Sequence, residues 1–241
     1  MVRKSKELDS IKLDISANQI LDGLPKNESD FLLPHLELVT LRQNEILARA
    51  GEQMVYCYFP QNAVLSMLAF MEEGVTVEVG LIGYEGLVGF HGVLGAKTWS
   101  NGADVQIPGD CLRMKMEVLQ DAFNRSRVLR DRLLRYVRYF LAQVTQTAAC
   151  NRVHKLESRL ARWLLMCNNR AKRNMIPITH EFLANMLGTP RSEVTIAAGK
   201  LRKSGLIHYG RGHITILDRK GLESAACECY PIVEHELLKP R

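Results

Sequence analysis

Residues 178–218, ITHEFLANMLGTPRSEVTIAAGKLRKSGLIHYGRGHITILD, contain two helical patterns that meet at a glycine. Apolar residues recur at helical spacing on both sides of Gly188, which predicts two helices joined by a tight turn. Thr179 is placed to cap the first helix, and Gly188 suits the left-handed backbone that ends it. Pro190 suits the opening of the second helix, which ends near Gly205. The pattern predicts a helix-turn-helix whose second helix fits the major groove of DNA.

A β-hairpin is predicted directly after the second helix. Two β-type runs, 206–209 and 213–217, flank the turn Gly210-Arg211-Gly212. Arg211 would lie at the tip of this hairpin, where its guanidinium can reach a DNA phosphate. A generic helical hairpin would explain the two helices but not the added hairpin. The stretch therefore favours a winged helix-turn-helix.

The charge of the 241-residue chain is distributed unevenly. Its formal net charge is +6, of which residues 1–149 contribute −2 and residues 150–241 contribute +8. A concentration of Lys and Arg on the part that holds the helix-turn-helix is typical of a surface that binds polyanions, because each cation laid on a phosphate releases counterions. The alternative is that these residues only solubilise helices.

The composition excludes several other classes of protein. A hydrophobic content of 46% with 24% charged residues is that of a chain with a real core, so wholesale disorder is excluded. No uncharged run reaches about 20 apolar residues, and residues 1–12 lack the apolar region of a secretory signal. The six cysteines show no disulfide framework, so we expect reduced thiols in a cytoplasmic protein with no membrane partner.

The sequence pattern of the N-terminal half predicts a small β-structure. Short apolar runs between turn residues over 39–70, with further strands at 75–79, 103–107 and 111–116, predict a sandwich or barrel. Glycine recurs at every third position from 80 to 95, which we interpret as a tight loop plus one short helix. A helical entry is expected before the strands, over 18–38, with Asn27 or Ser29 as the cap of its second helix, after a break at Gly23-Leu24-Pro25.

A long helical pattern begins at about Glu117 and continues for some thirty residues. Its apolar positions step by 4, 3, 4 and 3, as in a coiled-coil seam. We expect this seam to form a dimer interface, and the alternative is a long helix packed on its own domain. The expected interface residues are Leu133, Val137, Phe140, Val144 and Thr147.

The chain resembles transcription regulators of the Crp/Fnr family over nearly its whole length. Residues 178–194 match the family signature I-T-x-x-x-[IL]-A-x-x-[IL]-G-x-x-R-x-x-V, and a Leu-Ile pair leads into the wing. The resemblance implies an α+β fold with a cyclic-nucleotide-binding-type β-roll (a double-stranded jelly roll), a long dimerisation helix and a C-terminal winged helix-turn-helix. The domains expected are a flexible tail (1–17), the β-roll sensor domain (18–120), the dimerisation helix (121–150) and the DNA-binding domain (151–241).

The resemblance also assigns roles to residues of the helix-turn-helix. Arg191 matches the arginine that reads a guanine edge in the family. The residues expected to contact DNA are Thr179, His180, Pro190, Arg191, Ser192, Glu193, Thr195, Lys200 and Arg211. Ile196 stands where many members have a second arginine, and Glu181 is acidic where a phosphate contact is common. We therefore expect an operator that differs from the usual family sequence, read by a homodimer on double-stranded DNA, with RNA polymerase as a further partner.

The sequence does not decide whether the protein binds a small-molecule effector. Glu85 resembles the family's ribose-binding glutamate, but no arginine occurs between Arg49 and Arg113 to hold a cyclic phosphate. Burying a phosphate without a bidentate partner is costly, so we expect no gating by cyclic AMP, and Glu85 is interpreted as a solvated or capping carboxylate. An effector pocket, if there is one, is expected at Tyr84, Glu85, His91, Lys97, Trp99 and Ser100.

No cofactor or metal is expected from the cysteines and histidines of the sequence. No cysteine precedes Cys57, which excludes the N-terminal ligand group of an iron–sulfur sensor, and haem would need His91 or Cys57 as an axial ligand. Cys227-x-Cys229 is too closely spaced to hold a metal by itself, and a thiol switch there is the alternative. A sensor acting on another protein is the alternative function. The sequence contains no nucleophile motif that would indicate an enzyme.

Overall fold

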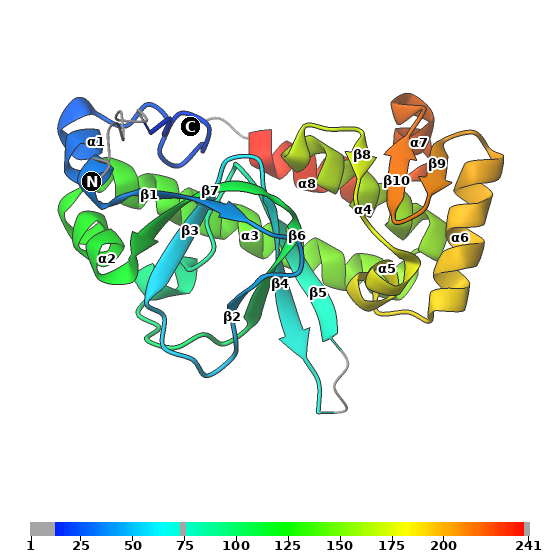
Figure 1. Ribbon diagram of the computed structural model, residues 1–241, viewed down its shortest axis with the longest axis horizontal. Helices are drawn as coiled ribbons and strands as arrows, with labels where there is room; N and C mark the ends of the chain where they lie inside the picture. Colours follow the sequence, from blue (N-terminus) through cyan, green and yellow to red (C-terminus); the bar gives the residue numbers. More distant parts are fainter. Residues whose placement is uncertain (1–12, 73–75, 239–241) are drawn as a thin grey trace, which may run out of the picture.

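The computed structural model describes residues 13–72 and 76–238, and it has two parts joined by one long helix (Figure 1). The first 12 residues of the expected tail lie outside this range. Residues 13–17, the rest of that tail, are not free of the domain, because Leu13 and Ile15 pack against the hydrophobic core. Within the described ranges, no helix has both the length and the apolar character needed to cross a membrane.

Two antiparallel sheets form the β-roll that the sequence predicts. The first contains, in spatial order, β1 (Glu37–Leu41), β7 (Gly109–Lys115) and β3 (Tyr56–Pro60). The second contains β2 (Ile46–Ala48), β6 (Gly102–Ile107), β4 (Val64–Phe70) and β5 (Thr76–Ile82). The first five residues of β4 are buried in succession, rather than alternately, because helices cover the face of this sheet that the other sheet does not.

The helices that frame the β-roll differ from the expected ones at their ends. In α1 (Lys26–Leu32) the N-cap is Pro25, and Asn27 and Ser29 lie inside the helix, so neither is the cap that we predicted. The helix expected from Glu117 onward is two helices, α2 (Met116–Arg125) and α3 (Arg127–Val153). Ser126 separates them, because its Oγ accepts a hydrogen bond of 2.9 Å from the Leu129 amide and caps α3.

The glycine repeat gives α3 and α4 (Leu156–Ala171) close access to the β-roll. A Cβ built on Gly80 would lie 2.8 Å from the ring of Phe140, and one on Gly83 would lie 2.6 Å from Cγ of Arg170. One on Gly86 would overlap the ring of Tyr136. The repeat continues into the 3₁₀ helix η2 (Phe90–Leu94), which is the short helix that the sequence predicts there. The missing side chains therefore create the surface on which two helices pack.

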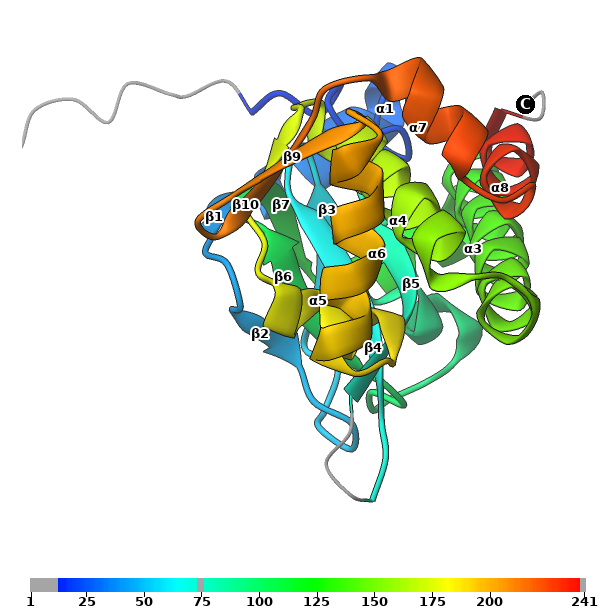
Figure 2. The ribbon, with the colours of Figure 1, turned by 90° about the vertical axis from the view of Figure 1, so that its right-hand side faces the viewer.

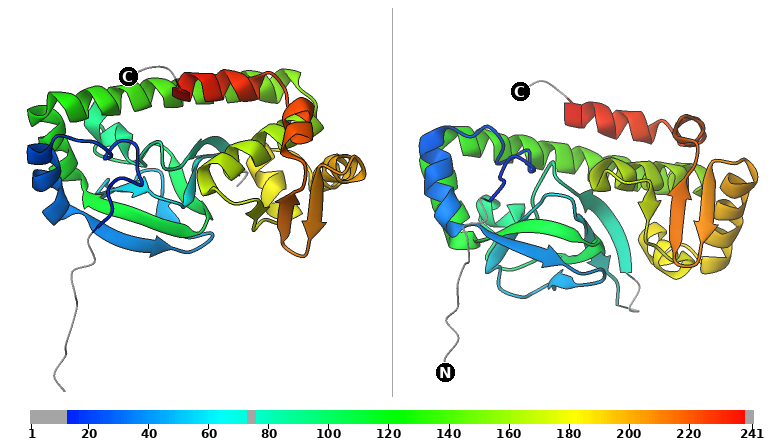
Figure 3. Two further views of the ribbon diagram at one scale, coloured as in Figure 1. Left: turned by 90° about the horizontal axis from the view of Figure 1, so that it is seen from above. Right: turned by 45° about the horizontal axis from the view of Figure 1, so that its top comes forward.

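The C-terminal part contains the predicted helix-turn-helix and wing (Figures 1 and 2). Its elements are β8 (Met175–Ile176), α5 (His180–Leu187), α6 (Arg191–Lys203), β9 (Ile207–Gly210), β10 (His213–Ile216), α7 (Arg219–Ala225) and α8 (Cys229–Leu238). The short strand β8 pairs with β10 and makes the wing a three-stranded sheet. The last helix, α8, returns to lie along α3 (Figure 3).

Candidate nucleic-acid interface

The turn between α5 and α6 has the geometry that the sequence predicts. Thr179 caps α5, and its hydroxyl accepts a hydrogen bond of 3.2 Å from the Phe182 amide. Gly188 ends α5 with a φ of +58°, a conformation that glycine adopts without strain. Pro190 occupies the N-cap position of α6, and the helix begins at Arg191. These local features fix the crossing of the two helices.

The recognition helix α6 lies at the end of the molecule away from the β-roll (Figures 1 and 2). Its apolar side packs against the rest of the domain through the buried residues Val194, Ala197, Ala198 and Leu201. The residues exposed on its outer side include Arg191, Ser192, Glu193, Thr195 and Ile196. The β-roll therefore leaves this side of α6 open to a large partner.

Two charged residues of the helix-turn-helix are already paired within the chain. The Arg191 guanidinium lies 3.6 Å from the Glu181 carboxylate, and both side chains are largely exposed. Lys200 forms an ion pair with Glu157, in the first turn of α4, so its ammonium is turned toward α4. Arg191 thus remains placed for a groove, whereas Lys200 is placed against its own domain.

His180 and Thr195 contact each other rather than extending separately from the surface. His180 Nδ1 lies 3.1 Å from Thr195 Oγ1, and its ring stacks on Tyr209 at a centroid distance of 4.0 Å. Burial and, secondly, the nearby Arg191 lower the pKa of His180. This group therefore joins α5, α6 and β9 in a fixed arrangement.

The wing ends in a tight turn with Arg211 at its tip. Residues of β9 and β10 pair from His213–Gly210 to Ile216–Ile207, and Gly212 has a φ of +76° between them. Arg211 is exposed, and the strands of the wing lie beside α6 (Figure 2). Arg191 on the helix and Arg211 on the wing are thus both exposed and accessible to a polyanion.

Three of the five residues expected at the dimer interface do not face out of the chain. Leu133 is fully buried, and Val137 and Phe140 are nearly so, because this side of α3 packs on the β-roll of its own chain. The adjoining stripe is the one that faces out, with Leu134 44% and Leu141 60% exposed. The outward stripe, at the same 4-3 spacing, is Leu134, Arg138, Leu141, Thr145 and Ala148.

Glu85 is neither a solvated nor a capping carboxylate, contrary to our interpretation. Its Oε1 lies 2.7 Å from Nε of Arg170, a residue of α4, and both side chains are almost completely buried. Nη2 of Arg170 also donates a hydrogen bond of 2.6 Å to the hydroxyl of Tyr139 on α3. The partner of the Glu85 carboxylate is therefore an arginine from the C-terminal part of the chain.

The six residues expected to line an effector pocket do not lie together. Tyr84 and Glu85 face α4, where the ring of Tyr84 is 4.5 Å from the Lys172 ammonium. Trp99 and Lys97 instead make backbone hydrogen bonds to the segment 51–54, and Ser100 and Lys97 are exposed. His91 stacks on Phe90 of η2, and burial lowers its pKa. A cavity of about 110 Å³ borders Glu85, but none of the other five lines it.

A second buried polar group joins the two parts of the molecule. Glu78 of β5 accepts a hydrogen bond of 2.9 Å from the indole nitrogen of Trp163 on α4, and one of 2.6 Å from Ser66. Burial raises the pKa of Glu78 to about 7. Gln106 adds a hydrogen bond of 3.4 Å to the sulfur of Cys167. The interface between the β-roll and α4 is thus partly polar and contains a titratable carboxyl.

Reasoning from sequence missed a group of four possible metal ligands. Cys150, His154, Cys227 and Cys229 have their ligand atoms within 4.8 Å of one another. The sulfurs of Cys150 and Cys227 lie within hydrogen-bond distance, and this contact lowers the pKa of Cys150 and raises that of Cys227. The sequence contains two short spacings of these residues. Cys150 and His154 are four residues apart, which places two side chains on one helix face, and Cys227 and Cys229 are two residues apart, but no local pattern connects the two pairs.

The comparisons with known proteins agree with this arrangement. Residues 158–225 match the family model of the Crp-like helix-turn-helix domain. Among solved structures, a Crp/Fnr-family transcriptional regulator from Eubacterium rectale is similar, with a TM-score of 0.67 and 18% identity over 87% of this chain and 98% of that one. FixK2 from Bradyrhizobium japonicum is also similar, with a TM-score of 0.68 and 16% identity over 80% and 98%.

A third similar structure is a Crp/Fnr-family regulator from Thermus thermophilus, with a TM-score of 0.63 and 21% identity over 79% of this chain and 98% of that one. No curated protein sequence matches the chain. The outward-facing helix-turn-helix, with its wing and the β-roll behind it, defines a DNA-binding transcription regulator. More particularly, residues 158–225 form a Crp-like helix-turn-helix domain, and the chain shares its fold with regulators of the Crp/Fnr family.

Proposed function

We propose that this regulator binds a palindromic operator as a homodimer and does so without cyclic AMP. The observation that carries the proposal is the open, cationic side of α6 and the wing, at the end of the molecule away from the β-roll. Two such helices, one from each chain, would enter successive major grooves about 34 Å apart. The half-sites of the operator are then one helical turn apart.

The outward stripe of α3 supports the homodimer. Leu134 and Leu141 are large apolar side chains, exposed along one side of the helix, and Ala148 continues the line. The small residues at Thr145 and Ala148 allow two helices to approach closely. A second copy of α3 covers this stripe with an identical one, as a two-fold axis requires.

Base recognition is assigned to the first two turns of α6. Arg191 is placed to bind the O6 and N7 atoms of a guanine through its guanidinium. Ile196, which is 60% exposed, can only make apolar contacts, and the thymine methyl group is the apolar feature of the major groove. Arg202, Lys203 and Arg211 are exposed and are assigned to phosphates. RNA polymerase is a further partner on the family resemblance alone.

The pairing of Glu85 supports the proposed independence from cyclic AMP. Its carboxylate is committed to Arg170, so a ribose hydroxyl would have to displace a buried guanidinium. Removing one member of a buried ion pair costs about 3–5 kcal/mol, which a nucleotide would have to offset. The sequence has no arginine between Arg49 and Arg113 to hold the phosphate of cyclic AMP. Binding of cyclic AMP therefore does not provide the free energy needed to break the Glu85–Arg170 pair.

The test is selection of operators from a random duplex library by the purified, ligand-free chain, followed by titration across a salt series. We expect enrichment of a palindrome, a steep fall in affinity with salt, and no change when cyclic AMP is added. A scrambled duplex of equal length is the control. Binding that is equally weak on every duplex, with or without cyclic AMP, would contradict the proposal and favour a protein partner.

A further inference from the structure

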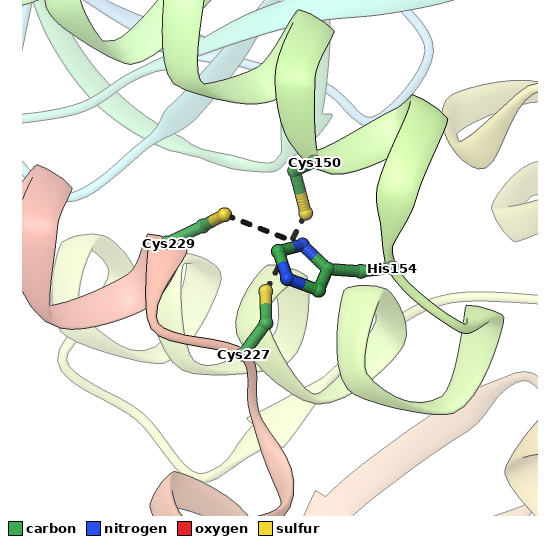
Figure 4. A group of neighbouring side chains, drawn as sticks. All are labelled: Cys150, His154, Cys227 and Cys229. Carbon is green, nitrogen blue, oxygen red and sulfur yellow. Dashed lines mark hydrogen bonds between the residues drawn. The ribbon is translucent and has the colours of Figure 1, made fainter.

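Four side chains with metal-binding atoms converge where the last helix meets the end of α3 (Figure 4). Cys150 and His154 lie one turn apart at the C-terminal end of α3. Cys227 lies in the turn before α8, and Cys229 is the first residue of that helix. All three cysteines are buried. The group thus joins segments that are about 75 residues apart in the chain.

We propose that Cys150, His154, Cys227 and Cys229 bind a single Zn²⁺ ion in a tetrahedral site. The sulfurs of Cys150 and Cys227 are 3.4 Å apart, and Cys229 Sγ is 3.5 Å from His154 Nδ1. Zn²⁺ binds thiolates at about 2.3 Å and imidazole at about 2.0–2.1 Å, so neighbouring ligand atoms of a tetrahedron lie about 3.5–4 Å apart. The four atoms are already near that spacing, and three cysteines with one histidine form a common structural zinc set.

The surroundings of the four residues are those of a metal site. His154 Nε2 lies 3.1 Å from Oε1 of Glu228, and because a carboxylate only accepts, this nitrogen carries the proton. Nδ1 is then left with a lone pair that faces Cys229. A carboxylate that orients a ligating histidine in this way is the usual partner of zinc-bound imidazole. Gln146 Nε2 also donates a hydrogen bond of 3.0 Å to Cys229 Sγ, which stabilises a thiolate.

The charge of the site is also balanced by the chain. Three thiolates around Zn²⁺ leave one net negative charge, and the Arg162 guanidinium of α4 reaches α3 close to Cys150, where it donates a hydrogen bond of 2.7 Å to Thr147 Oγ1. The four ligand atoms are grouped around one point, which suits one ion and not a cluster with several irons. Only His154 and Lys155 separate α3 from α4, so the ion would fix α8 at the joint between the sensor helix and the DNA-binding domain.

The test is the metal content of the full-length chain, purified under reducing conditions and dialysed after exposure to zinc. We expect about one zinc ion per chain when the metal content is measured by inductively coupled plasma mass spectrometry. Replacement by Co²⁺ should give the visible bands of tetrahedral thiolate coordination, which depend on the ligands and not on DNA binding. Cys229→Ser and His154→Ala should lose most of the metal, whereas His154→Cys should retain it because four thiolates also suit zinc.

A matched control is Cys111→Ala, which removes a buried thiol of the β-roll and should leave the zinc content unchanged. Far-ultraviolet circular dichroism of each variant separates loss of the site from loss of the fold. Wild-type protein without stoichiometric zinc and without the cobalt spectrum would overturn the proposal even if every variant failed to fold. A Cys150–Cys227 disulfide in the reduced preparation, or the absorption of an iron–sulfur cluster, would overturn it as well.

Discussion

Arg191 illustrates how a single exposed side chain is prepared for its role. Its ion pair with Glu181 spans 3.6 Å in solvent, where such pairs contribute about 0–1 kcal/mol, so it is easily exchanged for a contact with DNA. The pair connects the first turns of α5 and α6 and thereby orients the guanidinium. If Glu181 meets phosphates, as the proposed DNA interface implies, its charge would oppose binding once Arg191 has left the pair.

Replacing Arg191 with alanine is expected to weaken operator binding by about 1–3 kcal/mol and to relax the preference at one base pair, as loss of a bidentate guanine contact does. Lys200→Ala is the comparison, because Lys200 is already paired with Glu157 and should lose less affinity. Binding measured on a set of single-base operator variants gives both quantities. An equal loss on every sequence would instead assign Arg191 to a phosphate.

Residues whose roles are local could be predicted from the sequence. Thr179 and Gly188 are positioned by backbone hydrogen bonds and dihedral angles a few residues away, and both have the predicted roles. The partner of Glu85 could not be predicted, since Arg170 follows it by 85 residues and belongs to another domain. Cys150 and Cys227 were missed for the same reason, because no local pattern connects residues 77 positions apart.

At the scale of the element, α3 shows why the spacing of apolar residues along a helix is easier to predict than which side of the helix faces the domain core. Two stripes of the helix, displaced by one residue, have the same 4-3 spacing. The sequence favours the more apolar of the two as the dimer seam. In the structure that stripe, which includes Leu133 and Phe140, is buried against the β-roll of the same chain. A period thus predicts an amphipathic helix but not which partner covers each side.

Leu141→Glu is expected to convert the protein to a monomer without unfolding it, because the exposed side chain of Leu141 would meet its copy across the two-fold axis. Leu133→Glu is the matched control, since it places a carboxylate in the core and should destabilise the chain strongly. Sedimentation velocity gives the mass, and thermal unfolding gives the stability. A Leu141→Glu protein that remains dimeric at micromolar concentration would exclude this stripe as the interface.

At the scale of the whole molecule, buried polar contacts hold the DNA-binding domain against the β-roll. Trp163 and Arg170 extend from α4 to Glu78 and Glu85 respectively, and Gln43 Nε2 donates a hydrogen bond of 2.6 Å to the carbonyl of Pro177. The fold of each domain follows from its own sequence pattern. Their docking depends on these long-range pairs, which is why the relative placement was beyond prediction.

The stability of the chain is expected to fall as the pH rises through about 7. Burial raises the pKa of Glu78 from 4.5 to about 7 in the folded chain, so the folded state binds its proton more tightly than the unfolded state. This contribution is complete below the unfolded pKa and is lost as the pH passes the folded one, for a total of about 3 kcal/mol. Urea unfolding over this pH range measures it.

Glu78→Gln keeps the acceptor for Trp163 and is expected to flatten this decline. Some slope should remain, because burial also raises the pKa of Asp104 to about 6. A Glu78→Gln protein with the same pH dependence as the wild type would assign the effect to other groups. The matched variant Glu72→Gln, at an exposed position of the β-roll, should behave as the wild type does.

The Glu85–Arg170 pair limits how freely this architecture can be recombined. A chimera that joins this β-roll to a helix-turn-helix without an arginine at the position of Arg170 would bury a carboxylate without its counter-ion, and a reciprocal chimera without a carboxylate at position 85 would bury an unpaired guanidinium. Either chimera is destabilised by an unpaired buried charge, even when the two sequences are joined within α3 without disturbing that helix. In engineered biosensors and in recombined genes alike, the residues at positions 85 and 170 must therefore come from the same parent protein.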